Sequence, residues 1–84
     1  MTAERLRAVR EANPFRPFVM HLADGRSLPV PHRDFVSQPP GGGRTIIVYG
    51  EGESFSIVDL YLVTELEVLE KGMPGPNGPS PRGS

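Results

Sequence analysis

The chain has 84 residues, a formal net charge of −1 and no cysteine. This length allows one domain, and the lack of cysteine excludes disulfides and any zinc site built on thiolates. No apolar run approaches the roughly 20 residues that cross a bilayer, and no apolar signal region begins the chain. A soluble cytoplasmic protein is therefore expected.

The C-terminal segment over residues 72–84 reads GMPGPNGPSPRGS and is rich in glycine and proline. Such a segment cannot bury enough apolar surface to offset the conformational entropy that ordering would cost. The sequence therefore predicts one folded domain over residues 1–71, followed by a disordered Gly/Pro-rich tail over residues 72–84.

A domain of this size has little material for a core. A core this small rarely contributes more than about 3–5 kcal/mol to stability. The charge is also uneven: residues 1–44 hold seven Arg against four acidic residues (+3), and residues 45–84 hold Lys71 and Arg82 against six (−4). Because poles of opposite sign can steer subunits together, we expect a homo-oligomer or a complex with another protein.

The first element is predicted to be a short helix. Thr2 is a suitable N-cap residue, and Leu6 and Val9 give a narrow apolar stripe at helical spacing. Pro14 disfavours helical geometry in the residue before it, so the helix should end by Asn13. A helix with so few apolar residues is marginal alone and is expected to pack over the sheet.

A β-hairpin is predicted next. Residues 18–22 alternate between apolar and less apolar side chains, and Ala23-Asp24-Gly25 follows as a turn. A two-residue loop would place Met20 opposite Pro29, whereas a three-residue loop with Gly25 in a left-handed conformation places Met20 opposite Leu28. The second register aligns the apolar faces, and we predict it.

Two prolines, Pro29 and Pro31, stand in the second strand of this hairpin. With Leu22 and Arg26 as the hydrogen-bonded closing pair, both prolines fall at sites whose N–H would point away from the first strand. The hairpin therefore loses no hydrogen bond, while its outer edge loses two donors. We predict that the prolines protect this edge against pairing with another strand.

The rest of the chain predicts further strands. A turn at His32–Asp34 precedes a short strand at Phe35-Val36, and strands at 45–49 and 54–58 form a second hairpin. Residues 59–69 fit either a helix or a strand. Because β-branched residues are frequent in the second half of this segment, we predict a short 3₁₀ turn and then a final strand.

Four short motifs lie along residues 3–70: PF-x-PF from Pro14, L-x-DGR from Leu22, V-x-H-x-x-F from Val30 and VT-x-LE from Val63. As a set they resemble a family of small uncharacterised bacterial proteins. The resemblance covers nearly the whole foldable chain and implies no particular activity.

A short helix followed by five strands, with a bent second strand and a 3₁₀ turn before the fifth, resembles the SH3-like small barrels, including Sm-like folds. The resemblance implies a mainly β protein: one N-terminal helix and a barrel of about five antiparallel strands. The Sm-like likeness is the weaker one. Val30 and Pro31 stand where a glycine is expected, and no Asn follows Asp34 at the spacing of the nucleotide pocket. The RNA-binding residues of Sm proteins therefore cannot be carried over.

No set of residues predicts catalysis, a cofactor or a metal site, since two histidines lack the further ligands and partners that such sites need. The predicted function is a non-catalytic module for self-association or protein interaction. Its candidate interface residues lie on two β-forming strands: Ile46, Val48, Tyr49, Leu66 and Val68.

The alternative function is weak binding of single-stranded RNA. Arginine side chains contact nucleic-acid backbones, and aromatic side chains stack on bases. The phenylalanines alternate into the predicted core instead, which is the better interpretation of at least Phe18 and Phe55. The candidate RNA-contacting residues are Arg16, Arg26, His32, Arg33 and Arg44.

Overall fold

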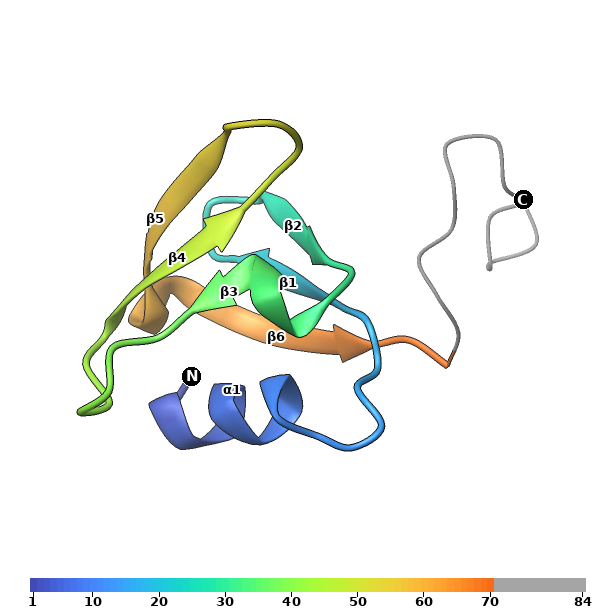
Figure 1. The fold of residues 1–84 in the computed structure, drawn as a ribbon. Helices are drawn as coiled ribbons and strands as arrows, with labels where there is room; N and C mark the ends of the chain where they lie inside the picture. Colours follow the sequence, from blue (N-terminus) through green and yellow to red (C-terminus); the bar gives the residue numbers. More distant parts are fainter. Residues whose placement is uncertain (71–84) are drawn as a thin grey trace.

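The computed structural model describes residues 1–70, which form one helix and six strands in two antiparallel sheets (Figure 1). The strand order is β2-β1-β6 in the first sheet and β3-β4-β5 in the second. The mainly β class with one N-terminal helix is therefore confirmed. The elements are α1 (Ala3–Arg10), β1 (Phe18–Leu22), β2 (Ser27–Val30), β3 (Val36–Ser37), β4 (Thr45–Tyr49), β5 (Phe55–Asp59) and β6 (Val63–Val68).

Helix α1 begins as predicted and ends earlier than predicted. The side chain of Thr2 accepts a hydrogen bond from the backbone N–H of Arg5, which caps the helix. The helix ends at Arg10, three residues before Asn13. Gln38, just after β3, donates to the carbonyl of Ala3 and accepts from Arg10 Nε, so both ends of α1 are tied to this loop.

The first hairpin has the predicted three-residue loop. Met20 lies opposite Leu28, and the backbone N–H of Leu22 donates to the carbonyl of Arg26 at 2.9 Å. Gly25 has φ of 95°, a conformation that side chains with a Cβ rarely adopt. Pro29 lies opposite Val19, and the pairs on either side of this one are hydrogen-bonded. Val19 and Pro29 therefore form a non-hydrogen-bonded pair, in which an N–H at position 29 would point away from β1.

A 3₁₀ turn, η1 (Arg33–Phe35), separates β2 from β3. This turn is why the structure has six strands where the sequence suggested about five: the bent second strand is divided at η1. Within residues 1–70 the strand pairs form two separate sheets, so a closed barrel stays a prediction.

The final segment is a short turn and then a strand, as predicted. The 3₁₀ turn η2 (Leu60–Leu62) is capped by Asp59, whose carboxylate accepts from the N–H of Tyr61 at 2.9 Å. Strand β6 then pairs with β1, with Val68 opposite Phe18. Thus β1 lies at the centre of the first sheet, between β2 and β6.

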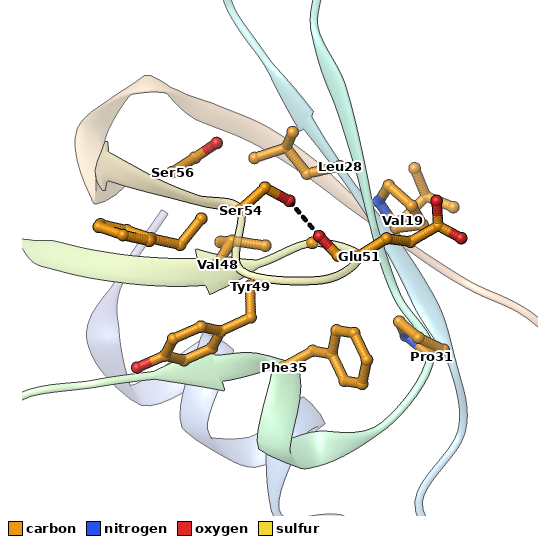
Figure 2. A pocket seen from close by; sticks show the side chains of 12 residues that line it. Val19, Leu28, Pro31, Phe35, Val48, Tyr49, Glu51, Ser54 and Ser56 are labelled. Carbon is orange, nitrogen blue, oxygen red and sulfur yellow. Dashed lines mark hydrogen bonds between the residues drawn. The ribbon is translucent and has the colours of Figure 1, made fainter.

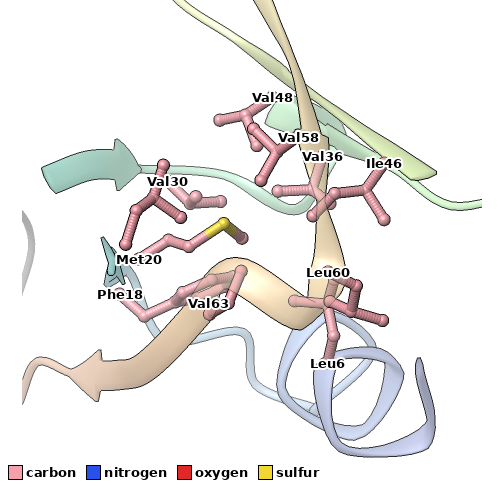
Figure 3. Packing of buried hydrophobic residues seen from close by; sticks show 11 residues of the cluster. Leu6, Phe18, Met20, Val30, Val36, Ile46, Val48, Val58, Leu60 and Val63 are labelled. Carbon is pink, nitrogen blue, oxygen red and sulfur yellow. The ribbon is translucent and has the colours of Figure 1, made fainter. Parts of the chain in front are cut away.

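One cluster of buried apolar side chains joins the two sheets and the helix (Figure 3). Leu6 is the buried residue of α1 and points into this cluster, which explains why so short a helix is stable here. The buried members are Leu6, Phe18, Met20, Leu22, Val30, Val36, Ile46, Val48, Val58, Leu60 and Val63.

Two further expectations concern the chain as a whole. The predicted tail over residues 72–84 lies outside the described residues, as does the domain boundary at residue 71. In the part of the chain that is described, no helix is long and apolar enough to cross a membrane.

Candidate interaction surface

Strand β5 has its two largest apolar side chains turned outward, while Val58 is buried. Its sequence FSIVD alternates aromatic or aliphatic residues with serine, which by pattern alone would place Phe55 and Ile57 in the core. Instead, Phe55 is 57% exposed and Ile57 66% exposed. The pairing with β4 is the cause: Ser56 lies opposite the buried Val48 and therefore shares its inward face.

The outward side chains of β4 and β5 together form one exposed apolar surface. Ile47 lies opposite Ile57, and Tyr49 lies opposite Phe55. Directly opposed side chains in an antiparallel pair have Cβ atoms about 4.5–5.5 Å apart, so each pair is in contact range. We call these four residues the apolar face. Three residues of the apolar face are exposed: Tyr49, Phe55 and Ile57. Tyr49 is the least exposed of them, at 41%.

A groove adjoins the apolar face and has a volume of about 550 Å³ (Figure 2). The groove lies between the β2 side of the first sheet and the hairpin that β4 and β5 form. Tyr49 and Phe55 belong to both the groove and the apolar face. The other lining side chains include Val19, Leu28, Pro29, Pro31, Phe35, Val48, Glu51, Ser54 and Ser56.

The groove gives the two prolines a second role besides the one predicted for them. Pro29 and Pro31 both line it, so their rings supply apolar surface on the side where β2 lacks donors. An extended segment lying there could not pair normally with the backbone of β2, because proline has no N–H. Contact in the groove would therefore depend on side chains.

The predicted interface residues fall on different faces of the molecule. Ile46 and Val48 are buried in the core, so they offer almost no surface to a partner; the little that Val48 exposes lies in the groove. Tyr49 lies on the apolar face. On β6, Leu66 is half-buried and packs against the core, whereas Val68 is exposed. Of the predicted set, Tyr49 and Val68 are thus the residues with exposed side chains.

The expectation that Phe55 belongs to the core is wrong, while that for Phe18 is confirmed. The sequence did not identify Phe55 and Ile57 as interface candidates, because their alternation with serine predicts that both side chains face the core. The turn between β4 and β5 contains the information that was needed. There the N–H of Gly50 donates to the carbonyl of Ser54 across a three-residue loop, and Gly52 has φ of 64°. That loop fixes Tyr49 opposite Phe55 and so determines the face.

The candidate RNA-contacting residues do not gather at one place. Arg16 precedes β1 and donates to the carbonyl of Leu69, whereas Arg26 lies beyond the other end of β1 and pairs with Asp24. Arg33 in η1 lies over the ring of Phe15, 5.6 Å from its centroid.

The other two candidates are also separated. His32 lies before η1, with its ring centroid 6.0 Å from that of Phe35. Arg44 precedes β4, pairs with Asp59 at 2.7 Å and stacks on Tyr61, 3.9 Å from the ring centroid. Three of the four candidate arginines thus contact a carboxylate or an aromatic ring of this chain.

The Arg44–Asp59 pair makes one prediction about pH. Hydrogen bonds from the Arg44 guanidinium, and then from the N–H of Tyr61, hold the pKa of Asp59 below its ordinary value. Since this pKa is lower in the folded chain than in the unfolded one, the stabilisation is present above about pH 4 and is lost as the pH falls through the folded pKa. When the pH is lowered from 5 to 2.5, the variant Asp59→Asn should therefore lose less stability than the unaltered chain, as measured by thermal unfolding.

The matched control is Asp34→Asn, since within residues 1–70 Asp34 forms no ion pair. An NMR titration of the carboxyl groups checks the cause directly. Equal acid sensitivity of Asp59→Asn and the unaltered chain would contradict the assignment.

His21 belongs to a small polar network on the outer face of the first sheet. Its Nε2 lies 2.9 Å from a carboxylate oxygen of Glu67 on β6, and its Nδ1 lies 2.9 Å from the hydroxyl of Ser27 on β2. The ring thus links the three strands of the sheet. Across residues 1–70 there is no group of three His, Cys, Asp or Glu residues that could hold a metal ion.

No match to this chain was found among protein-family models, curated proteins or solved structures.

Proposed function

We propose that the chain is a non-catalytic interaction module that self-associates, or docks a protein partner, through the apolar face. One observation carries the proposal: β5 exposes Phe55 and Ile57 and turns Ser56 inward. The opposite arrangement would bury two large apolar side chains in a domain that has few of them. A strand that exposes its best core residues is better explained by a surface that is covered in an assembly.

The proposal includes the finer fold prediction of an SH3-like barrel. The supporting features are the hairpin β1–β2, the bend at η1, the hairpin β4–β5 and the 3₁₀ turn η2 before the last strand. Within residues 1–70, the outer face of the second sheet is exposed at Phe55 and Ile57, so it can meet a partner.

RNA binding receives less support than protein binding. Two exposed aromatic side chains, Tyr49 and Phe55, share their groove with Glu51. A carboxylate beside a stacking platform repels a phosphate backbone. The arginines that could attract RNA are spread over several elements, and Arg44 and Arg26 are already paired with aspartates.

The test is a comparison of assembly across concentration. Burying one large apolar side chain contributes about 1.5–3 kcal/mol, so Phe55→Ser/Ile57→Thr should weaken self-association at least about 10-fold. Sedimentation velocity over a wide concentration range measures the dissociation constant. The matched control is Val68→Thr, which removes an exposed apolar side chain from β6 and should leave the constant unchanged.

A protein partner is tested by pull-down with the same three chains. Retention by the unaltered chain and by Val68→Thr, with loss in Phe55→Ser/Ile57→Thr, supports docking at the apolar face. A chain that stays monomeric at every concentration and retains no protein contradicts the proposed function.

A further inference from the structure

Strand β5 is an edge strand with free backbone groups. In the part of the chain that the structure describes, β4 is its one paired neighbour. Gly50 donates to the carbonyl of Ser54, and Leu60 donates to the carbonyl of Arg44, so the hydrogen-bonded pairs of this ladder fall on even-numbered residues. Because the pattern alternates, the N–H and C=O groups of Phe55, Ile57 and Asp59 point away from β4.

The free edge of β5 lacks the features that usually prevent edge pairing. Proteins protect edges with proline, lysine, bulges or very short strands. β2 contains such a proline at Pro29, but β5 has five residues, no proline, no lysine and a continuous register with β4. The same residues whose backbone groups are free also carry the exposed side chains of the apolar face.

We propose that a second copy of the chain pairs with this edge, β5 against β5, antiparallel and related by a two-fold axis at Ile57. The inference rests on the proposed function and specifies the edge that the two copies share. The apolar face is then covered where Phe55 and Ile57 meet their opposed side chains across the axis. Ile57 then lies opposite Ile57 of the second copy, and Phe55 lies opposite Asp59. This register overlaps the whole strand and satisfies the outward backbone groups of all three residues in both copies.

The pairing also joins the two apolar faces. Both second sheets become one continuous sheet, and Ile47 and Ile57 of each copy form a single apolar row across the axis. An isologous contact of this kind closes after two subunits, because each copy uses the same edge. It predicts a dimer and no larger ring.

Charge complementarity favours a second copy over an unrelated strand. In the antiparallel arrangement, the β4–β5 turn of one copy approaches the end of β5 in the other. That turn carries Glu51 and Glu53, and the opposite end of the hairpin carries Arg44, exposed and stacked on Tyr61. Arg44 already bonds Asp59 of its own chain through Nε and one terminal nitrogen, so its other terminal nitrogen is the group that Glu51 or Glu53 of the second copy can reach, twice per dimer.

A single-cysteine experiment tests this geometry, since the chain has no cysteine of its own. Opposed residues of a hydrogen-bonded antiparallel pair have Cα atoms about 5.5 Å apart, within the roughly 4.4–6.8 Å that a disulfide spans. Ile57→Cys should form a disulfide-linked dimer under mild oxidation. The control Val68→Cys, on the exposed part of β6, should stay monomeric under the same conditions.

A second measurement uses the unaltered chain. Amide hydrogen exchange at Phe55 and Ile57 should slow as concentration rises through the dissociation constant, because these N–H groups become hydrogen-bonded in the dimer. The exchange of Thr64 on β6 should not change with concentration.

The outcomes separate this inference from the proposed function. An assembled chain in which Ile57→Cys does not cross-link and these amides keep exchanging overturns the β5 pairing and leaves the proposed function standing. Cross-linking of Ile57→Cys to Val68→Cys in a mixture indicates a head-to-tail contact and also overturns it. A chain that sediments as a monomer at every concentration overturns the pairing. The proposed function still stands in that case if the unaltered chain retains a protein partner and the Phe55→Ser/Ile57→Thr variant does not.

Discussion

Replacing Phe18 with alanine is expected to unfold most of the protein at 25 °C, whereas the same replacement at Phe55 should leave it folded. Phe18 is fully buried at 0% exposure and belongs to the core cluster. Truncating a buried phenylalanine costs about 3–5 kcal/mol. A core of this size contributes about that much in total, so little stability would remain. Urea unfolding followed by circular dichroism measures both variants.

The comparison with Phe55 makes the experiment specific, because the two variants remove the same atoms. Phe55 is more than half exposed, and substitutions on the surface usually change stability within about 0.5 kcal/mol. Unfolding is measured at a concentration below the dissociation constant of any assembly, since association adds apparent stability. Equal losses in the two variants would show that Phe55 is a core residue and that β5 is turned the other way.

Replacing Pro29 and Pro31 together, with Thr and Val, is expected to keep the fold and to produce large assemblies. Both new residues favour strands. The one at position 29 restores an N–H on the outer edge of β2, and the one at position 31 restores an N–H directly after this strand, which ends at Val30. A free, unprotected edge is a template for pairing with other chains. Light scattering across concentration should show that the mean mass of the double variant rises well beyond that of a dimer. The mean mass of the unaltered chain should not exceed that of a dimer.

The control for the proline variant is Val19→Thr, which lies opposite Pro29 and also lines the groove but leaves every backbone donor as it was. It should not aggregate. If the double proline variant scatters no more light than the unaltered chain, the prolines shape the groove and do not protect the edge.

Much of the fold could be predicted wherever one physical constraint was strong. The register of the first hairpin follows from aligning Met20 with Leu28, because a shift of one residue would move every apolar side chain to the opposite face. The final strand follows from the β-branched residues of its segment. In the structure the carboxylate of Asp59 caps the turn that precedes this strand.

The candidate surface was harder to predict, for a reason visible in β4. Ile46, Ile47 and Val48 are all apolar, so alternation does not say which side chains face the core. In β5 the pattern gave the wrong face, because Phe55 and Ile57 alternate with serine. The pairing across the β4–β5 turn decides both strands at once, and that depends on tertiary contacts that local pattern does not contain.

The position of β1 has a consequence for how the domain is made during synthesis. β1 leaves the ribosome before the other strands of residues 1–70, yet one of its two neighbours, β6, is the last strand of the described chain. Pairings between such distant segments have high contact order and form slowly. Until β6 emerges, one edge of β1 is unpaired and Leu6 lacks Leu60 and Val63, two members of its buried cluster. Nascent chains are therefore most vulnerable to proteases and aggregation just before the last strand is complete.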